Sequence, residues 1–413
     1  MTKGKLFDNK KTVIGSLILL VILTSSIGFK TAVSICRPKY GQGHVFSDAN
    51  SPKDGYTLVS SYIGDNLYSK PGEVRLIDRT GRVAHSWQTQ YQPLYAKLEK
   101  SGHIYVTMTP PIVQANYPSA GTTGVIQELD WNSKVLWEYK DDQMTHSFDV
   151  LPNGNIVYDR WEKAPEEFSE KVVGGFPNTV IPVWTNSVVE VNRDKKKVWE
   201  WQMHDHLNPE EFKLAAATQK RDWAHVNSVK YVADNPINHK PAFLVSARHL
   251  STAMFIDIES KDVLWRSPAG MFSYQHDATY LSNGHVMVFD NGFNREDGKP
   301  ILLSRVVEVD PLTNQIAWEY KGGDSVIEQA ALESSIMGGA NRLPNGNTLI
   351  TISTQGKIFE VTSDKKVVWE YDERLSNSNS DNPINFKSAV YYPEGTDWAD
   401  KVKDNSLSHF VCK

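Results

Sequence analysis

Three histidines occupy equivalent places in strand-like stretches of this 413-residue chain. His146 lies seven residues before Asn153, and His276 lies seven residues before Asn283. Each asparagine precedes a glycine, the pair that suits a tight hairpin turn. His225 opens a third such stretch, AHVNSV. No packing rule places imidazole at the same position of successive strands, so we expect the three side chains to converge on one functional site.

Further polar residues fall near the same end of these strands. Arg248 and Arg160 end the strands that follow His225 and His146, and Asn227 lies on the same strand face as His225 because it is two residues further on. Imidazoles, an amide and guanidinium groups together indicate an anion pocket that can also supply a nucleophile.

Two other polar stretches are weaker candidates. The turn DNGFNR contains Asp290, Asn291 and Arg295, which could lean over the pocket as substrate-binding residues or serve the turn alone. His204 and His206, in the loop MHDHLNPEEF, could bind a metal, although a polar lid is the better interpretation. The sequence has no nucleophile elbow, Walker loop, dinucleotide fingerprint or H-E-x-x-H motif, and we expect no cofactor.

A repeated hairpin must position these residues. A strand with a polar turn, followed by a strand that closes on tryptophan, recurs six times, as in VIQELDWNSKVLWEY and VVEVDPLTNQIAWEY. The tryptophans lie 50 to 66 residues apart, which suits four-stranded propeller blades with variable loops. They are Trp87, Trp137, Trp199, Trp265, Trp318 and Trp369. The sequence therefore predicts an all-β protein whose residues 55–413 form a six-bladed propeller.

The two ends of the propeller complement each other. Residues 55–87 match the last three strands of a blade, and residues 387–395 match the missing first strand. A propeller must close its ring, so we expect a C-terminal strand to join the N-terminal blade. Closure would bring Cys36 and Cys412, the two cysteines of the chain, onto one blade, where they could pair.

The N-terminal segment carries a membrane signal. Lysines precede an uncharged stretch, VIGSLILLVILTSSIGF, at residues 13–29. We predict that residues 1–54 comprise a short cytoplasmic tail, a signal-anchor segment and a linker, although a cleaved signal is also compatible with this length. Either outcome exports the remainder, so the propeller is expected in the periplasm or another extracytoplasmic space, anchored to the membrane by one helix.

The charge balance excludes one class of partner. The chain has 49 acidic and 44 basic residues, a formal net charge of −5, and no basic block that would neutralise phosphates. We therefore expect no nucleic acid as a partner. The sequence carries no signal for an oligomeric state.

Several stretches resemble a known family. DHLNPEEF, DWAHVNSV, SARHLSTAMFID, QHDATYL, VFDNG and SRVVEVD are similar to the bacterial arylsulfate sulfotransferases, which use no nucleotide sulfate donor. The resemblance covers residues 124–371 and implies a six-bladed propeller. It also implies ping-pong transfer of a sulfuryl group from a phenolic sulfate ester to a phenolic acceptor through a sulfohistidine.

The resemblance assigns roles by motif. His276 of QHDATYL would be the nucleophile, while His146, His225 and Arg248 would hold the sulfuryl oxygens and handle the phenolic proton with help from Asn227. A neutral imidazole is a competent nucleophile near pH 7, and a phenol of pKa about 10 leaves readily, so no metal is required. Two departures are visible. There is no room for the family's extra N-terminal β domain, and SSIMGGANRL stands where the family has a supporting threonine.

Three alternatives remain open. Propellers often serve as interaction scaffolds, so the chain could bind an anionic or aromatic ligand without catalysis. Three converging histidines could instead hold zinc or iron, although the neighbouring Arg248 argues against a cation. A sulfatase that uses water as the acceptor is the third alternative.

Overall fold

The structure is a computed structural model of the chain. It describes residues 36–38, 44–48, 51, 54–63, 71–111, 117, 121–177, 181–293, 295, 303–373, 384–393, 398, 401–402 and 410–412. Within these residues no helix is long and apolar enough to cross a membrane. The predicted anchor at residues 13–29 lies outside the described residues and stays a prediction.

Six antiparallel sheets form the blades, each with its innermost strand first. Blade 1 is β28 (Ile384–Tyr392), β3 (Tyr56–Ile63), β4 (Gly72–Asp78) and β5 (Val83–Thr89). Blade 2 is β6 (Gln92–Leu98), β7 (Ile104–Thr109), β8 (Val125–Leu129) and β9 (Val135–Lys140). Blade 3 is β10 (Met144–Val150), β11 (Ile156–Lys163), β13 (Trp184–Val191) and β14 (Lys197–Gln202).

The second half of the chain continues the ring. Blade 4 is β16 (Val226–Val232), β17 (Ala242–Ala247), β18 (Thr252–Asp257) and β19 (Val263–Arg266). Blade 5 is β20 (His276–Tyr280), β21 (Val286–Asp290), β22 (Arg305–Asp310) and β23 (Gln315–Tyr320). Blade 6 is β24 (Gly339–Arg342), β25 (Thr348–Ile352), β26 (Lys357–Val361) and β27 (Val367–Asp372). The six-bladed prediction is confirmed.

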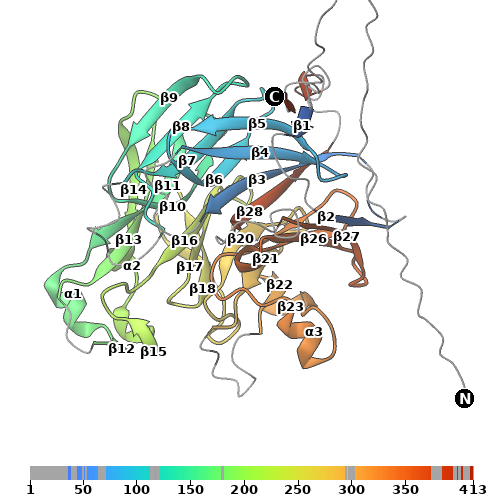
Figure 1. Cartoon of the computed structure of the whole chain (residues 1–413). Coiled ribbons are helices and arrows are strands. Elements are labelled where there is room, and N and C mark those ends of the chain that lie inside the picture. Colours follow the sequence, from blue (N-terminus) through green and yellow to red (C-terminus); the bar gives the residue numbers. More distant parts are fainter. Residues whose placement is uncertain are drawn as a thin grey trace, which may run out of the picture.

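The ring closes as expected. Innermost strands contact one another from β6 through β10, β16, β20 and β24 to β28, and β28 returns to β6 (Figure 1). β28 pairs with β3, so the C-terminal strand completes the N-terminal blade. β2 (His44–Ser47) adds a fifth strand to blade 6, and β1 (Cys36–Pro38) pairs with β29 (Phe410–Cys412). This pairing sets Cys36 opposite Cys412 in backbone register; their disulfide stays a prediction.

The repeated tryptophans link neighbouring blades. In five of the six junctions the indole Nε1 donates a hydrogen bond to a turn of the next blade. The pairs are Trp137 to Arg193 O (2.9 Å), Trp199 to Ile258 O (2.8 Å), Trp265 to Asn314 Oδ1 (2.9 Å), Trp318 to Ser363 O (3.0 Å) and Trp369 to Arg79 O (2.9 Å). The exception, Trp87, packs edge-on against Trp131 at 5.2 Å. Each such bond contributes about 1 kcal/mol to the junction.

The innermost strands of blades 3, 4 and 5 are bulged near their first residues. The pairing register shifts within residues 144–148 of β10, 226–228 of β16 and 276–279 of β20. A bulge bends its strand and re-aims the side chains beside it. The three predicted histidines lie at or next to these bulges, at the same end of their strands.

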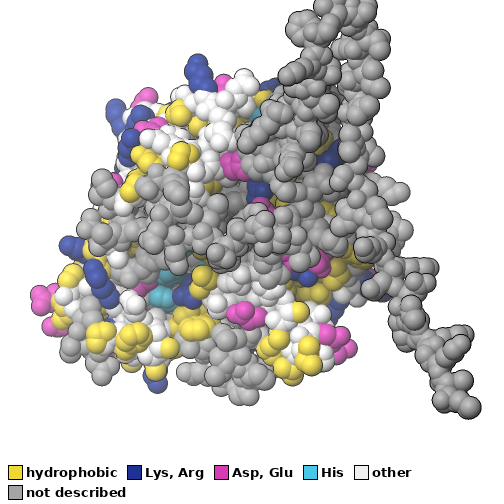
Figure 2. All heavy atoms as spheres, in the orientation of Figure 1, with side chains coloured by type: hydrophobic (Ala, Val, Ile, Leu, Met, Phe, Trp, Pro, Cys, Tyr) yellow, Lys and Arg dark blue, Asp and Glu magenta, His cyan; other side chains and the backbone are white. Residues whose placement is uncertain are grey.

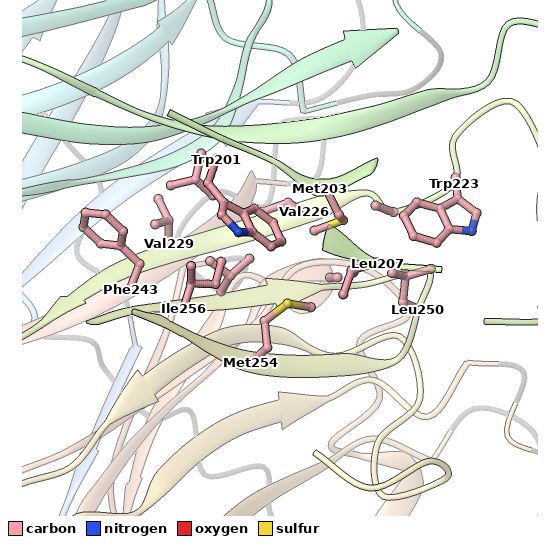
Figure 3. Close-up of a cluster of buried hydrophobic side chains, with 14 of the residues drawn as sticks. Trp201, Met203, Leu207, Trp223, Val226, Val229, Phe243, Leu250, Met254 and Ile256 are labelled. Atoms are coloured by element: carbon pink, nitrogen blue, oxygen red, sulfur yellow. The ribbon is translucent and has the colours of Figure 1, made fainter. Parts of the chain in front are cut away.

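Two insertions support that end of the ring. Between β11 and β13 of blade 3 lie α1 (Glu166–Lys171) and β12 (Gly174–Phe176). Between blades 3 and 4 lie α2 (Met203–His206), the 3-10 turn η2 (Pro209–Glu211) and β15 (Leu214–Gln219), and β15 pairs with β12 in parallel. Apolar side chains of both insertions join the core between the two blades, where Met203, Leu207, Trp223 and Leu250 pack together (Figure 3). Two short elements, α3 (Val326–Ala330) and η3 (Ser353–Gln355), lie in loops of blades 5 and 6.

Candidate active site

The predicted histidines gather at one mouth of the channel. The imidazoles of His146 and His225 are 4.7 Å apart between ring centroids. His276 lines a small cavity together with Tyr95, Ser147 and Asn227. Ser147 follows His146 in blade 3, and Asn227 is two residues beyond His225 in blade 4, so His276 lies close to both blades. All three histidines are buried. In the space-filling view a histidine lies beside a basic side chain in a recess on the side where α1 and β12 stand (Figure 2).

His276 is held by a neutral amide. Its Nδ1 lies 2.7 Å from Asn291 Oδ1. The other end of this amide, Asn291 Nδ2, donates to Ser334 O at 2.6 Å and to Met337 O at 2.8 Å, which fixes the amide orientation. Asn291 Oδ1 must then accept, so Nδ1 of His276 carries the hydrogen. The lone pair of the imidazole is on Nε2, and the Met337 N–H donates to it over a long 3.3 Å.

His225 is held by a carboxylate. Its Nδ1 donates to Asp222 Oδ2 at 2.6 Å, and both residues are buried. Asp222 also accepts from His249, whose Nδ1 donates to the Asp222 carbonyl oxygen at 2.7 Å. A buried carboxylate orients an imidazole and stabilises its protonated form.

Arg248 provides a guanidinium group whose described contacts are a neutral imidazole and an aromatic ring. Its guanidinium donates to His249 Nε2 at 2.8 Å and lies 4.7 Å from the ring centroid of Tyr274. Burial lowers the pKa of Arg248, and its Nε has no hydrogen-bond partner among the described residues. A half-buried guanidinium whose Nε is buried without a partner among the described residues favours an anion.

His146 approaches a glycine. Its Nδ1 lies 2.6 Å from Thr145 Oγ1, and a Cβ on Gly121 would lie 2.0 Å from its Nε2. Gly121 also has a φ of +100°, a conformation that other residues rarely adopt. The position therefore requires glycine on both grounds, a requirement that the repeat pattern did not reveal.

Asn227 ties blade 4 to the nucleophile candidate. Its Nδ2 donates to the carbonyl oxygen of Gln275, the residue before His276, at 2.8 Å. The Asn227 Oδ1 faces no hydrogen-bond partner among the described residues. One amide hydrogen is thus committed to positioning β20, which leaves the other for a ligand.

Two predicted cations belong to ion-pair networks. Arg160 contacts Gln143 and lies 3.1 Å from Asp141, and in the described part of the chain its contacts are with these groups and nearby carboxylates rather than the histidines. Arg295 donates to the buried Asp290 at 2.7 Å, a carboxylate that Arg305 also binds at 2.7 Å. The contacts of Arg295 stabilise the turn after β21, which agrees with the structural interpretation of DNGFNR. A substrate-binding role for Arg160 or Arg295 stays a prediction.

One group with metal-ligand spacing occurs among the described residues, and it is not the predicted loop pair. His206 stacks on Trp201 at 4.8 Å, and His204 lies 3.6 Å from Asp205. The group is Asp222, His225 and His249, whose ligand atoms lie within 4.8 Å of one another. Hydrogen bonds already join these three residues, and the Arg248 guanidinium contacts His249. The arrangement therefore suits a hydrogen-bond network better than a cation.

The fold and this mouth define a class: a six-bladed propeller with a cluster of imidazoles and a guanidinium group at one end of its channel. The family model described as Arylsulfotransferase (ASST) matches residues 118–374, more than half of the chain and the whole of this site. The chain belongs to the arylsulfotransferase family, and sulfuryl transfer is the chemistry of that family.

Other comparisons concern the fold. A crystal structure of a protein of unknown function from Bacteroides caccae is 13% identical, with a TM-score of 0.50, and covers 83% of this chain and 100% of its own. The WD40 propeller domain of Doa1 is 12% identical with a TM-score of 0.44, covering 87% of this chain and 99% of its own. Among curated proteins, no sequence matches.

Proposed function

We propose that this arylsulfotransferase moves a sulfuryl group from a phenolic sulfate ester to a phenolic acceptor, without a nucleotide donor, through a sulfohistidine at His276. The observation that carries the proposal is the hydrogen bond between His276 Nδ1 and Asn291 Oδ1. With the Nδ1 hydrogen committed to Asn291, the lone pair is on Nε2, where it accepts from the Met337 N–H, as a nucleophile requires.

The first half-reaction forms one bond and breaks another. The lone pair of His276 Nε2 attacks sulfur as the bond from sulfur to the phenolic oxygen breaks. Charge develops on the phenolic and sulfuryl oxygens, so fixed donors matter more than a strong base. Arg248 supplies the cation for the sulfuryl oxygens, and an imidazolium beside it gives its proton to the leaving phenolate.

The second half-reaction reverses these movements. An acceptor phenol enters, its hydroxyl proton passes to the imidazole that served as the acid, and its oxygen takes the sulfuryl group as the bond from sulfur to Nε2 breaks. His276 returns to its neutral form. Because the donor product leaves before the acceptor enters, ping-pong kinetics are expected.

The family's supporting threonine has no equivalent in SSIMGGANRL. The Met337 N–H, 3.3 Å from His276 Nε2, is positioned to replace it. A backbone donor at this place would face a sulfuryl oxygen once Nε2 carries the group. Its long bond to the resting nucleophile costs little to break.

The test combines turnover with intact mass. Purified protein is incubated with a chromogenic aryl sulfate, with and without added phenol, and the protein mass is measured after donor alone. We expect phenol release that the acceptor stimulates and a sulfonate adduct that His276→Ala lacks. His285→Gln is a matched control, since His285 pairs with Glu308 at 2.7 Å outside the histidine register.

Each alternative has its own outcome. No release from any aryl sulfate would favour a ligand-binding propeller, and turnover that ignores the acceptor would favour a sulfatase. Stoichiometric bound metal would favour a site built on Asp222, His225 and His249. Activity only with a nucleotide sulfate would reject the proposed donor class.

A further inference from the structure

Two residues to which the sequence analysis assigned no role, Asp222 and His249, lie behind the site. We infer that they form a positioning unit in which Asp222 makes His225 the proton-transfer group and His249 sets Arg248 as the sulfuryl-binding cation. The inference rests on the proposed function and divides its roles among the site residues.

Asp222 sets which nitrogen of His225 can exchange a proton and which protonation state of the ring is favoured. The carboxylate is fully buried and accepts the Nδ1 hydrogen at 2.6 Å, so the other ring nitrogen, Nε2, is the one that can exchange a proton with substrate. His276 has the same geometry with a neutral amide in place of the carboxylate. The negative charge favours an imidazolium at His225, whereas the amide leaves His276 neutral.

His249 determines the position of Arg248. Its Nδ1 donates to the Asp222 carbonyl oxygen at 2.7 Å and its Nε2 accepts from Arg248 at 2.8 Å, which requires a neutral ring. Burial, with help from the nearby Arg248 and His225, lowers the pKa of His249 to about 3, so the ring is neutral near pH 7. The guanidinium is thereby held between this imidazole and the Tyr274 ring.

The backbone makes these residues one rigid unit. The Arg248 N–H donates to His225 O at 3.0 Å, and the His249 N–H donates to Ala224 O at 3.1 Å. Core side chains alternate with the polar ones: Trp223 follows Asp222 and Leu250 follows His249, and both lie in the cluster shown in Figure 3. A displacement of either loop would therefore move the acid and the cation together.

The proton balance is then explicit. In the resting enzyme His276 is neutral and His225 carries protons on both nitrogens. As the bond from His276 Nε2 to sulfur forms, the His225 Nε2 proton passes to the phenolate oxygen, and His225 becomes neutral. The acceptor phenol returns a proton to the same nitrogen in the second half-reaction.

The test measures how leaving-group basicity controls the rate. Asp222→Asn keeps a side-chain oxygen for His225 but removes the charge. With a nitrophenyl sulfate, whose phenolate needs no proton, kcat/KM should fall about threefold, and with a methoxyphenyl sulfate about a hundredfold. A merely structural defect would lower kcat/KM by the same factor for both donors. An equal loss of kcat/KM, or no loss, would therefore overturn the inference.

A second variant separates the two halves of the unit. His249→Gln should raise KM for every aryl sulfate about tenfold with little change in kcat, because binding of the sulfuryl oxygens is impaired while the acid is intact. A change in leaving-group dependence, or an unchanged KM, would contradict the assignment of His249 to Arg248.

Two controls keep the outcome interpretable. Asp257→Asn alters another buried aspartate, the last residue of β18, and should leave the leaving-group dependence at the wild-type value. If Asp222→Asn does not fold, His225→Gln must show the same steep dependence, and a shallow one would overturn the inference. If the wild-type protein forms the adduct on His276 but Asp222→Asn and His225→Gln show no steeper leaving-group dependence than the wild type, only this inference is rejected. If the wild-type protein forms no adduct, the proposed function is rejected.

Discussion

His225 and His276 enter the channel mouth from adjacent blades with nearly the same geometry and different partners. His225 Nδ1 lies 2.6 Å from a buried carboxylate oxygen of Asp222, and His276 Nδ1 lies 2.7 Å from a buried amide oxygen of Asn291. Distance and burial do not distinguish the two imidazoles; the charge behind each ring does. The comparison teaches that histidines at equivalent positions in a repeat can have partners of different charge.

The largest expected effect comes from exchanging each histidine for alanine. His276→Ala should lower turnover at least about a thousandfold and abolish the mass adduct, because no nucleophile remains. His225→Ala should still form the adduct with a nitrophenyl donor, since only the acid is lost. Single-turnover phenol release and intact mass distinguish the two. If His225→Ala also loses the adduct with that donor, the two rings do not have separate roles.

The next effect comes from giving His276 the partner type of His225. Asn291→Asp would place a carboxylate beside the nucleophile, stabilise its protonated form and lower kcat/KM about a hundredfold near pH 7. Activity should recover as the pH rises, because deprotonation restores the lone pair. A profile parallel to the wild type, measured from pH 6 to pH 9, would show that the charge behind this ring is unimportant.

A smaller effect tests the third histidine. Gly121→Ala would place a Cβ 2.0 Å from His146 Nε2, and we expect about a tenfold loss of kcat/KM with a loss of unfolding free energy of about 1 to 3 kcal/mol. Gly154→Ala is the matched control, since Gly154 also has a positive φ but nothing within 4 Å of the added Cβ. Gly154→Ala should lower the free energy of unfolding, measured with a denaturant, and leave kcat/KM unchanged. Equal activity losses in both variants would exclude a role for His146.

The smallest effect concerns a histidine and carboxylate pair outside the mouth. His285 lies 2.7 Å from Glu308, and its side chain is 24% exposed. His285→Gln should change the unfolding free energy by less than about 1 kcal/mol and leave kcat/KM unchanged. A marked fall in kcat/KM would mean that a histidine and carboxylate pair affects activity wherever it lies. The effect of changing His225 would then not be evidence for a role at the channel mouth.

The sequence was sufficient for the fold because the fold is repetitive. Hairpin turns and closing tryptophans recur with every blade, so the six blades and the closing strand were predictable. That strand was expected at residues 387–395 and lies at residues 384–392. The hydrogen bonds of the indoles were not, since each depends on a turn in the next blade. The histidine register was predictable for the same reason as the blades.

The partners of the histidines were not predictable because they come from loops without repeats. Asp222 and His249 both lie in stretches that carried the family resemblance, DWAHVNSV and SARHLSTAMFID, but nothing in either pattern says that the two loops meet. Asn291 was identified as a residue that could bind substrate, whereas its side-chain amide contacts His276 and the carbonyl oxygens of Ser334 and Met337. Bulges in the innermost strands also redirect side chains in a way that simple alternation does not anticipate.

The strand that closes the ring also sets an order of events during synthesis. The indole of Trp369 bonds to a turn of blade 1, and β28 completes that blade from residues 384–392. Until those residues have emerged, all three histidines can be present on finished blades while the channel wall between blades 6 and 2 is still incomplete. A nascent chain would thus hold every reactive group of the site before it has the enclosure in which those groups are useful.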